Sequence, residues 1–208
     1  MNRTTLLLIL GSCALLPATL TQAGGFTSGI AVGAGTIEAG TLYTTYMEPT
    51  ELSESTEFVR FFGAYEFNRY FAVEASFVTF ADIEARLSTS DSAPLYPGHY
   101  SNLFRVEAHA LQLGLTASWP VTDRLRLRAG GGATLNTTST ELTGGRYGFA
   151  DDTSRNVMGF EAHAEIEYSL TKRLVLGARA THRDFGTELA TSDDATATTF
   201  ELLIGFRL

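Results

Sequence analysis

The chain alternates apolar residues with polar or small ones over long stretches, and this pattern restricts its fold more than any other feature. The alternation is clearest in the last stretch. One set there is Phe200, Leu202, Ile204, Phe206 and Leu208, and the other is Thr199, Glu201, Leu203, Gly205 and Arg207. A period of two residues is that of a β-strand, whose side chains point to opposite faces in turn. The pattern therefore predicts strands with one apolar face.

The connections between these stretches are alternately short and long. Three short polar turns, at 67–71, 121–125 and 170–174, recur about fifty residues apart. Long polar connections cover 47–57, 88–102, 141–156 and 186–195. The strands between them are predicted at 26–46, 58–67, 71–87, 103–119, 125–140, 157–170, 174–185 and 196–208. Eight antiparallel strands with tight turns at one end and long loops at the other predict an all-β, up-and-down transmembrane β-barrel.

Alternation alone does not say which face points inward, because a soluble periplasmic lipid-carrying barrel would have its apolar face inside. Two features favour the membrane. The polar face carries closely spaced charges of both signs, and aromatic residues of the apolar face gather near the short turns, as in an interfacial girdle. These aromatics are Phe67, Phe71, Trp119, Tyr168 and Phe206. The fourth strand loses phase near Glu107 and His109, which indicates a bulge or a strand that extends above the bilayer.

The N-terminal segment is typical of an export signal. Asn2 and Arg3 precede an apolar run, and Thr21-Gln22-Ala23 suits a signal peptidase, so we predict a cleaved signal peptide over 1–23 and a barrel domain over 24–208. The alternatives are a membrane anchor and a lipoprotein acylated at Cys13. Cleavage after Ala23 removes the single cysteine and moves the formal charge from −8 to −9, because Arg3 leaves too. This acidity argues against nucleic acid as a partner.

The charges of the polar face are the candidate site. Since the lumen of an eight-stranded barrel is just wide enough for side chains to fill, we expect them to pair inside it, a structural role, with slow ion leakage through a small pore as the alternative. The predicted lumen charge network comprises Arg60, Glu66, Glu74, Arg126, Arg128, Glu161, Glu165, Glu167, Arg179, Glu201 and Arg207, and Arg183 lies on the same face. Glu165 and Glu167 offer general acid and base chemistry only in principle.

Little else in the sequence predicts chemistry, and we expect no enzyme, cofactor or metal. His99, His109, His163 and His182 lack metal-ligand spacing. His182 is the one candidate base for a lipid A-modifying enzyme, but no serine lies beside it in the sequence. The glycines at 130–132 and 144–145 lack the residues of a phosphate-binding loop. An acidic first loop, with Glu48, Glu51, Glu54 and Glu57, is a candidate for divalent cations that bridge to lipopolysaccharide.

Three segments resemble the small outer-membrane β-barrels of the OmpA-like and OmpX-like, porin-family group. These are the glycine-rich opening 25–29, the terminal alternating strand, and the 63–74 segment with its Gly-x-x-x-x-Asn-x-x-x-x-Val-Glu form. Leu208 stands where this family usually has Phe or Trp. The resemblance implies an outer-membrane location, insertion by the barrel assembly machinery, an isolated monomeric barrel and no catalytic residues. Its loops would contact lipopolysaccharide, host or phage.

This topology predicts which sites are accessible on intact cells. We expect the long loops outside and the turns at Asn68, Asp123 and Lys172 in the periplasm. A cysteine introduced at Thr50 should therefore react with a membrane-impermeant maleimide on intact cells, whereas one at Asp123 should react only after lysis. Selective labelling at Asp123 on intact cells would reverse the orientation.

Overall fold

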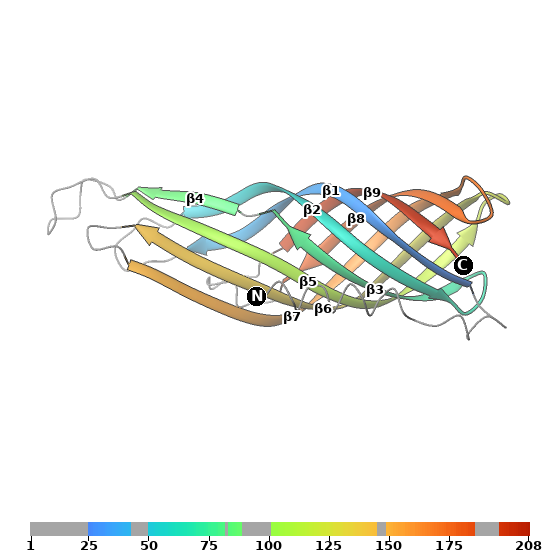
Figure 1. The fold of residues 1–208 in the computed structure, drawn as a ribbon, viewed down its shortest axis with the longest axis horizontal. Coiled ribbons are helices and arrows are strands. Elements are labelled where there is room, and N and C mark those ends of the chain that lie inside the picture. The colour runs from blue at the N-terminus through green and yellow to red at the C-terminus, as the bar shows by residue number, and fades with distance from the viewer. Residues whose placement is uncertain (1–24, 43–49, 82, 89–100, 145–148, 186–195) are drawn as a thin grey trace, which may run out of the picture.

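The computed structural model describes residues 25–42, 50–81, 83–88, 101–144, 149–185 and 196–208. The predicted signal peptide, Cys13, Glu48 and His99 lie outside these residues. In the described part no helix is long and apolar enough to cross a membrane. The strands there are β1 (Gly25–Leu42), β2 (Thr50–Glu66), β3 (Phe71–Phe80), β4 (Ile83–Ser88), β5 (Ser101–Pro120), β6 (Leu125–Gly144), β7 (Phe149–Ser169), β8 (Leu174–Asp184) and β9 (Thr196–Arg207) (Figure 1).

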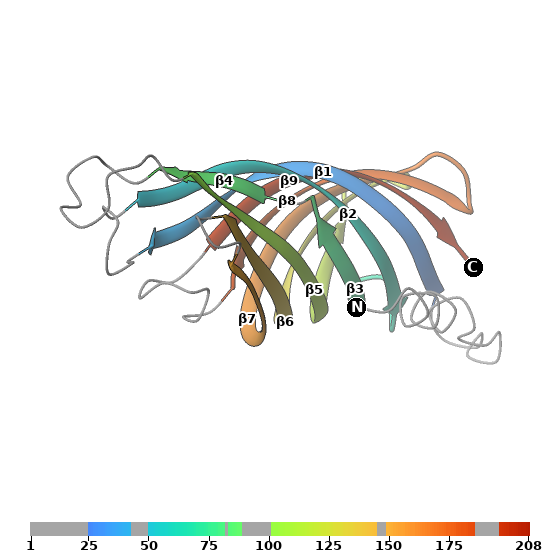
Figure 2. The same cartoon turned by 60° about the vertical axis from the view of Figure 1, so that its left-hand side comes forward.

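These strands form one closed antiparallel barrel. β1 pairs with β2, β2 with β3 and β3 with β5, each strand from β4 to β8 pairs with the next, and β9 pairs back onto β1. Because β4 also pairs with β5, β3 and β4 are two parts of one wall strand, and the described wall has eight strands as predicted. Paired residues followed once around the wall lead from Gly25 to Gly35, ten residues along β1. Such a stagger requires tilted strands, as Figures 1 and 2 show.

The three short turns occur where the sequence predicts them, and one polar side chain organises each. The Asn68 Oδ1 atom accepts hydrogen bonds from the backbone N–H groups of Tyr70 at 2.8 Å and Phe71 at 3.0 Å. Thr122 and Thr171 use their hydroxyl oxygens in the same way. These side chains occupy backbone donors that the tight turn leaves unpaired. All three turns lie at the same end of the barrel (Figure 1).

Two strands extend further toward the loops than predicted. β2 begins at Thr50 rather than at 58, and β7 begins at Phe149 rather than at 157. These extensions are polar, so they show no apolar alternation, but antiparallel backbone pairing does not require it. β5 keeps its alternation past Glu107 and His109, with Ala108 and Ala110 buried and no shift in register. The strand therefore extends beyond the apolar band without a bulge.

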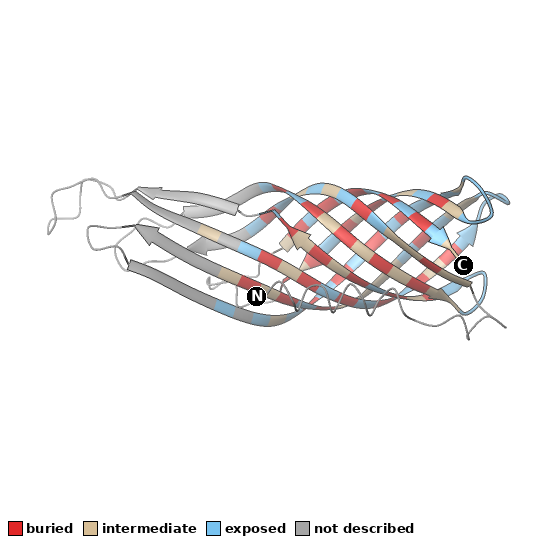
Figure 3. Cartoon of the chain, viewed as in Figure 1, coloured by how far each residue is buried: buried red, intermediate tan, exposed pale blue. Residues whose placement is uncertain are grey.

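Buried residues alternate with exposed or partly exposed ones along most of the described wall (Figure 3). The exposed face is apolar, with Leu113 62% and Phe200 67% exposed, and the buried face carries most of the charges. On β5 the outward apolar run goes from Trp119 to Leu111 and ends at His109. At a rise of about 3.4 Å and a tilt of about 40°, this run is roughly 21 Å high, close to the apolar band of an outer-membrane barrel. The polar face is thus the lumen.

Glycines of β1 make room for large side chains inside the barrel. A Cβ atom on Gly29 would lie 2.7 Å from the Phe62 ring and would overlap the Ile204 carbonyl oxygen. A Cβ atom on Gly33 would lie 2.6 Å from the Phe58 ring. The closeness of β1 to Phe58 and Phe62 therefore depends on glycine at both positions.

Two alanine substitutions in β1 test this packing. We expect Gly29→Ala to lower the free energy of unfolding by about 1–3 kcal/mol, because the wall must shift to admit a methyl group. Gly25→Ala should change it by less than about 0.5 kcal/mol, since the nearest heavy atom to a Cβ there is Glu66 Oε2, at 3.9 Å. Urea unfolding in lipid vesicles measures both, and equal losses would contradict the packing argument.

Candidate functional site

Charged side chains from six wall strands meet in the middle of the lumen. We call this group the central charge network. Its members are Arg60 of β2, Glu74 of β3, Arg128 of β6, Glu165 and Glu167 of β7, Arg179 of β8, and Glu201 and Arg207 of β9. The four arginines and four glutamates balance in formal charge. Alternation brings them together, because each occupies an inward position on its strand.

Arg179 is the centre of this network. Its Nη1 and Nη2 atoms donate to the two carboxylate oxygens of Glu74 at 2.7 and 2.8 Å. Its Nε atom donates to Glu165 at 2.7 Å and lies 3.4 Å from Glu201 Oε1. β8, which carries Arg179, and β3, which carries Glu74, are four strands apart in a wall of eight, so they lie on opposite sides. The bidentate pair therefore spans the lumen.

The other arginines extend the network around and along the lumen. Arg60 donates to Glu74 at 2.9 Å and to Glu201 at 3.0 Å. Arg128 donates to Glu165 and Glu167 at the longer distances of 3.2 and 3.3 Å. Arg207 donates to Glu167 at 2.6 Å. Arg207 lies closer to the turns, so the network also reaches toward that end.

Among the described lumen residues, further ion pairs lie outside the central network. On the turn side Arg126 lies 3.1 Å from Glu66, and both side chains are partly exposed. On the loop side Arg183 pairs with buried Glu161, whose Oε1 atom is 3.6 Å from His163 Nδ1. All eleven residues of the predicted network thus lie in the lumen, and each takes part in at least one ion pair.

Burial makes the pairing necessary. The side chains of Glu74 and Arg179 are 0% and 1% exposed, and an isolated charge at that depth would lose its hydration without compensation. Arg179 has carboxylates on several sides. Arg128 is less completely bonded, because its Nε and Nη2 atoms are buried without a hydrogen-bond partner. Arg179 is therefore the residue on which the network depends most.

On the loop side of the network, apolar residues form part of the lumen lining, which the predicted polar interior did not include. We call this group the apolar layer, formed by Ile37, Phe58, Val78, Phe80, Ala108, Ala110, Phe185 and Ala197. The Phe80 ring lies 5.6 Å from that of Phe58 and 5.9 Å from that of Phe185, centroid to centroid. The Arg183 guanidinium lies 5.5 Å from the Phe80 centroid and so connects this layer to the charged one.

A signal for this layer was present in the sequence. Phe58 and Phe62 have the same parity as Arg60 along β2, and Phe80 has the same parity as Glu74 along β3. Apolar residues on both parities break the simple rule of a greasy outside and a polar inside. Residue type alone therefore does not distinguish these inward aromatics from the outward ones.

The remaining candidates do not form a reactive group. Glu165 and Glu167 are both bonded to arginine. Exposed His182 faces outward, and its Nδ1 atom lies 3.2 Å from the hydroxyl of Thr198 rather than beside a serine. Gly130 lies under the His163 ring, where a Cβ atom would come within 2.8 Å. Within the described ranges, no group of three His, Cys, Asp or Glu residues is arranged to hold a metal ion.

Comparisons with known proteins agree with this geometry. A family model described as "Outer membrane protein beta-barrel domain" matches residues 5–207. The attachment invasion locus protein Ail of Yersinia pestis, solved with the heparin analogue sucrose octasulfate, is 17% identical with a TM-score of 0.51, over 88% of this chain and 99% of Ail. Neisserial surface protein A is 14% identical with a TM-score of 0.55, over 90% of this chain and 99% of that protein.

The N-terminal β-barrel domain of OprF from Pseudomonas aeruginosa is also similar. It is 11% identical with a TM-score of 0.54, over 90% of this chain and 98% of that domain. At such identities the likeness to these three structures shows the fold alone. A search of curated proteins finds no match.

Two methionine substitutions test the role of burial in the network. We expect Arg179→Met to lower the free energy of unfolding by about 3–5 kcal/mol, because it leaves buried carboxylates uncompensated. Arg126→Met should lower it by about 1 kcal/mol or less, since that ion pair is partly exposed to water. Urea titration in vesicles compares the two, and similar losses would show that position in the network does not set the cost.

Proposed function

This chain belongs to the outer-membrane protein β-barrel family, and from that premise we propose that it is a surface-interaction and structural barrel with a closed lumen. The outer-membrane location follows from the family and the fold. The proposal concerns what the barrel does there. It assigns the interior to stability and the loop end to contacts with other molecules.

One observation supports the closed lumen: two chemically different groups of side chains lie in series along it. An ion that enters from the loop side reaches the rings of Phe58, Phe80 and Phe185, which offer no polar partner to replace its water. Hydrophobic constrictions of this kind stop ions by excluding water. The ion would then meet arginines and glutamates already bonded to one another. Passage would require both layers to rearrange.

A structural interior also argues against an enzyme. The buried carboxylates of the central network are held by arginine, so they are not available as general bases. We further propose that residues 1–23 are a cleaved signal peptide, that the barrel assembly machinery inserts the chain, and that the barrel is a monomer. The outward apolar face is continuous, and lipid is sufficient to cover it without a second protein, which supports a monomer.

The charges on the outer surface near the loops favour one kind of partner. Glu38, Glu57 and Glu107 are exposed there. Ail was solved with a polyanionic sugar, but acidic side chains would repel such a ligand here. We propose that this end contacts lipopolysaccharide through divalent cations that bridge the carboxylates to its phosphates.

Planar-bilayer recordings test the closed lumen. We expect the wild-type protein to show no large steady current. Phe80→Ala combined with Phe185→Ala should produce frequent openings, because water can enter the apolar layer once two rings are gone. The matched control is Phe160→Ala with Phe200→Ala, which removes two outward rings, 70% and 67% exposed, and should leave the current unchanged. Large steady currents from the wild-type protein would replace this proposal with an open pore.

A further inference from the structure

We propose that the turn end of the barrel binds the head groups of anionic phospholipids through four exposed cations. We call these the turn cations: Arg69, Arg124, Lys172 and Arg173. This inference uses the membrane placement of the family but not the closed lumen, so either can fail without the other.

The three turns present these cations in equivalent places. In each turn the bonding side chain, Asn68, Thr122 or Thr171, accepts from the backbone two and three residues later. Arg69 and Lys172 directly follow that side chain. Arg124 and Arg173 are each the second residue after it. Because the turns are alike and lie at one end of the barrel, the four charges are held at a similar level beyond the wall.

The protein compensates these charges only in part. The described turns at 67–70, 121–124 and 170–173 contain one acidic residue, Asp123, against four cations. The neighbouring arginines of the lumen, Arg126 and Arg207, point inward and are already paired with glutamates. A net positive ring therefore faces the head-group region, where each Lys or Arg near an anionic surface contributes to binding.

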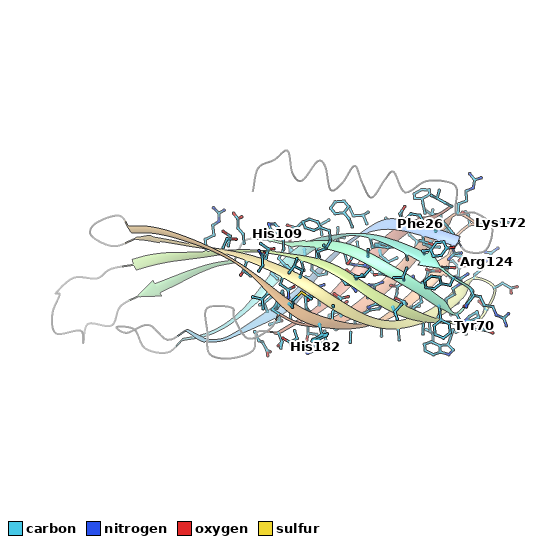
Figure 4. The ribbon with its side chains drawn as sticks, turned by 90° about the horizontal axis from the view of Figure 1, so that it is seen from below. Phe26, Tyr70, His109, Arg124, Lys172 and His182 are labelled. Atoms are coloured by element: carbon cyan, nitrogen blue, oxygen red, sulfur yellow. The ribbon has the colours of Figure 1, made fainter. Side chains whose placement is uncertain are left out.

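Aromatic side chains fix the depth of this ring. Outward Phe71, Trp119 and Tyr168 lie on the wall within a few residues of the turns and are 58%, 56% and 41% exposed. Such rings mark the boundary between hydrocarbon and head groups. The Arg69 guanidinium lies 4.6 Å from the Tyr70 ring centroid, which holds one cation at that boundary. Figure 4 shows Tyr70, Arg124 and Lys172 together at this end, away from His109 and His182.

The opposite end carries the opposite sign. The exposed carboxylates of Glu38, Glu57 and Glu107 lie on the loop side. An anionic phospholipid is thus attracted directly to the turn end, whereas at the loop end an anionic head group needs bridging cations. The ligand class that fits the turn end is a phospholipid with a net negative head group, such as phosphatidylglycerol, rather than a zwitterionic one.

The chain contains its own reporter for this site. Trp119 is the single tryptophan, and only Pro120 separates it from the turn that carries Arg124. Bromine atoms on lipid chains quench tryptophan fluorescence at short range, so the quenching of Trp119 measures the lipids beside this turn. The purified barrel would be reconstituted in phosphatidylcholine bilayers with an equal mole fraction of dibrominated phosphatidylglycerol or dibrominated phosphatidylcholine.

We expect the wild-type protein to prefer phosphatidylglycerol beside Trp119 by on the order of fivefold, the effect of about one cation near an anionic surface. The preference should fall at high salt. Replacing the turn cations with glutamine (R69Q, R124Q, K172Q and R173Q) should abolish it, while the charge-conserving R69K, R124K and R173K variant should retain it. The control E57Q with E107Q changes charge only at the loop end and should leave the quenching ratio unaltered.

Equal quenching by the two brominated lipids in the folded wild-type protein would overturn the proposal and leave an acidic protein as the partner for these cations. Equal loss of preference in the lysine variant would also overturn it, because the effect would then depend on arginine geometry rather than on charge. If the glutamine variant does not fold, the wild-type salt dependence and the lysine variant still decide the outcome.

Discussion

The structure depends on one constraint: in hydrocarbon every backbone N–H and C=O group must find its partner within the protein. A sheet with two free edges cannot meet this condition, and a closed one can. Pairing of β9 with β1 closes the wall, and the ten-residue stagger sets the tilt of the strands. Strand number and stagger together fix the width of the lumen. The interior chemistry is therefore a response to a space that the backbone defines.

Two kinds of side chain occupy that space. Toward the loops, aromatic rings pack against one another. In the middle, opposite charges pair after losing their hydration, which is favourable only because nearly every carboxylate has an arginine within bonding distance. The aromatic rings and the charged side chains require different residues around them. The rings require volume, and glycines of β1 supply it, whereas the charges require balance, and four arginines against four glutamates supply that.

Much of this architecture could be predicted from the sequence, because a period of two residues identifies a strand and its faces directly. The recurring polar segments at 67–71, 121–125 and 170–174 identify the turns, and the inward parity of the eleven charged residues places them in one lumen. Parity does not give the partners, because cross-lumen pairs such as Arg179 with Glu74 depend on closure and stagger. The extensions of β2 and β7 were missed since their polar residues carry no periodic signal. Phe80 and Phe185 were missed because the sequence does not distinguish a phenylalanine that points inward from one that points outward.

The bond between Arg179 and Glu74 joins opposite sides of the wall, and this has a mechanical consequence. A thin cylinder under uneven lateral pressure deforms most easily by flattening into an ellipse, a motion that stretches one diameter while shortening another. Wall hydrogen bonds resist it weakly, because they only bend. A bidentate ion pair across the diameter resists it by stretching, as a strut does in a tube. The network thus stiffens the cross-section of the barrel against changes in the packing of the surrounding lipid.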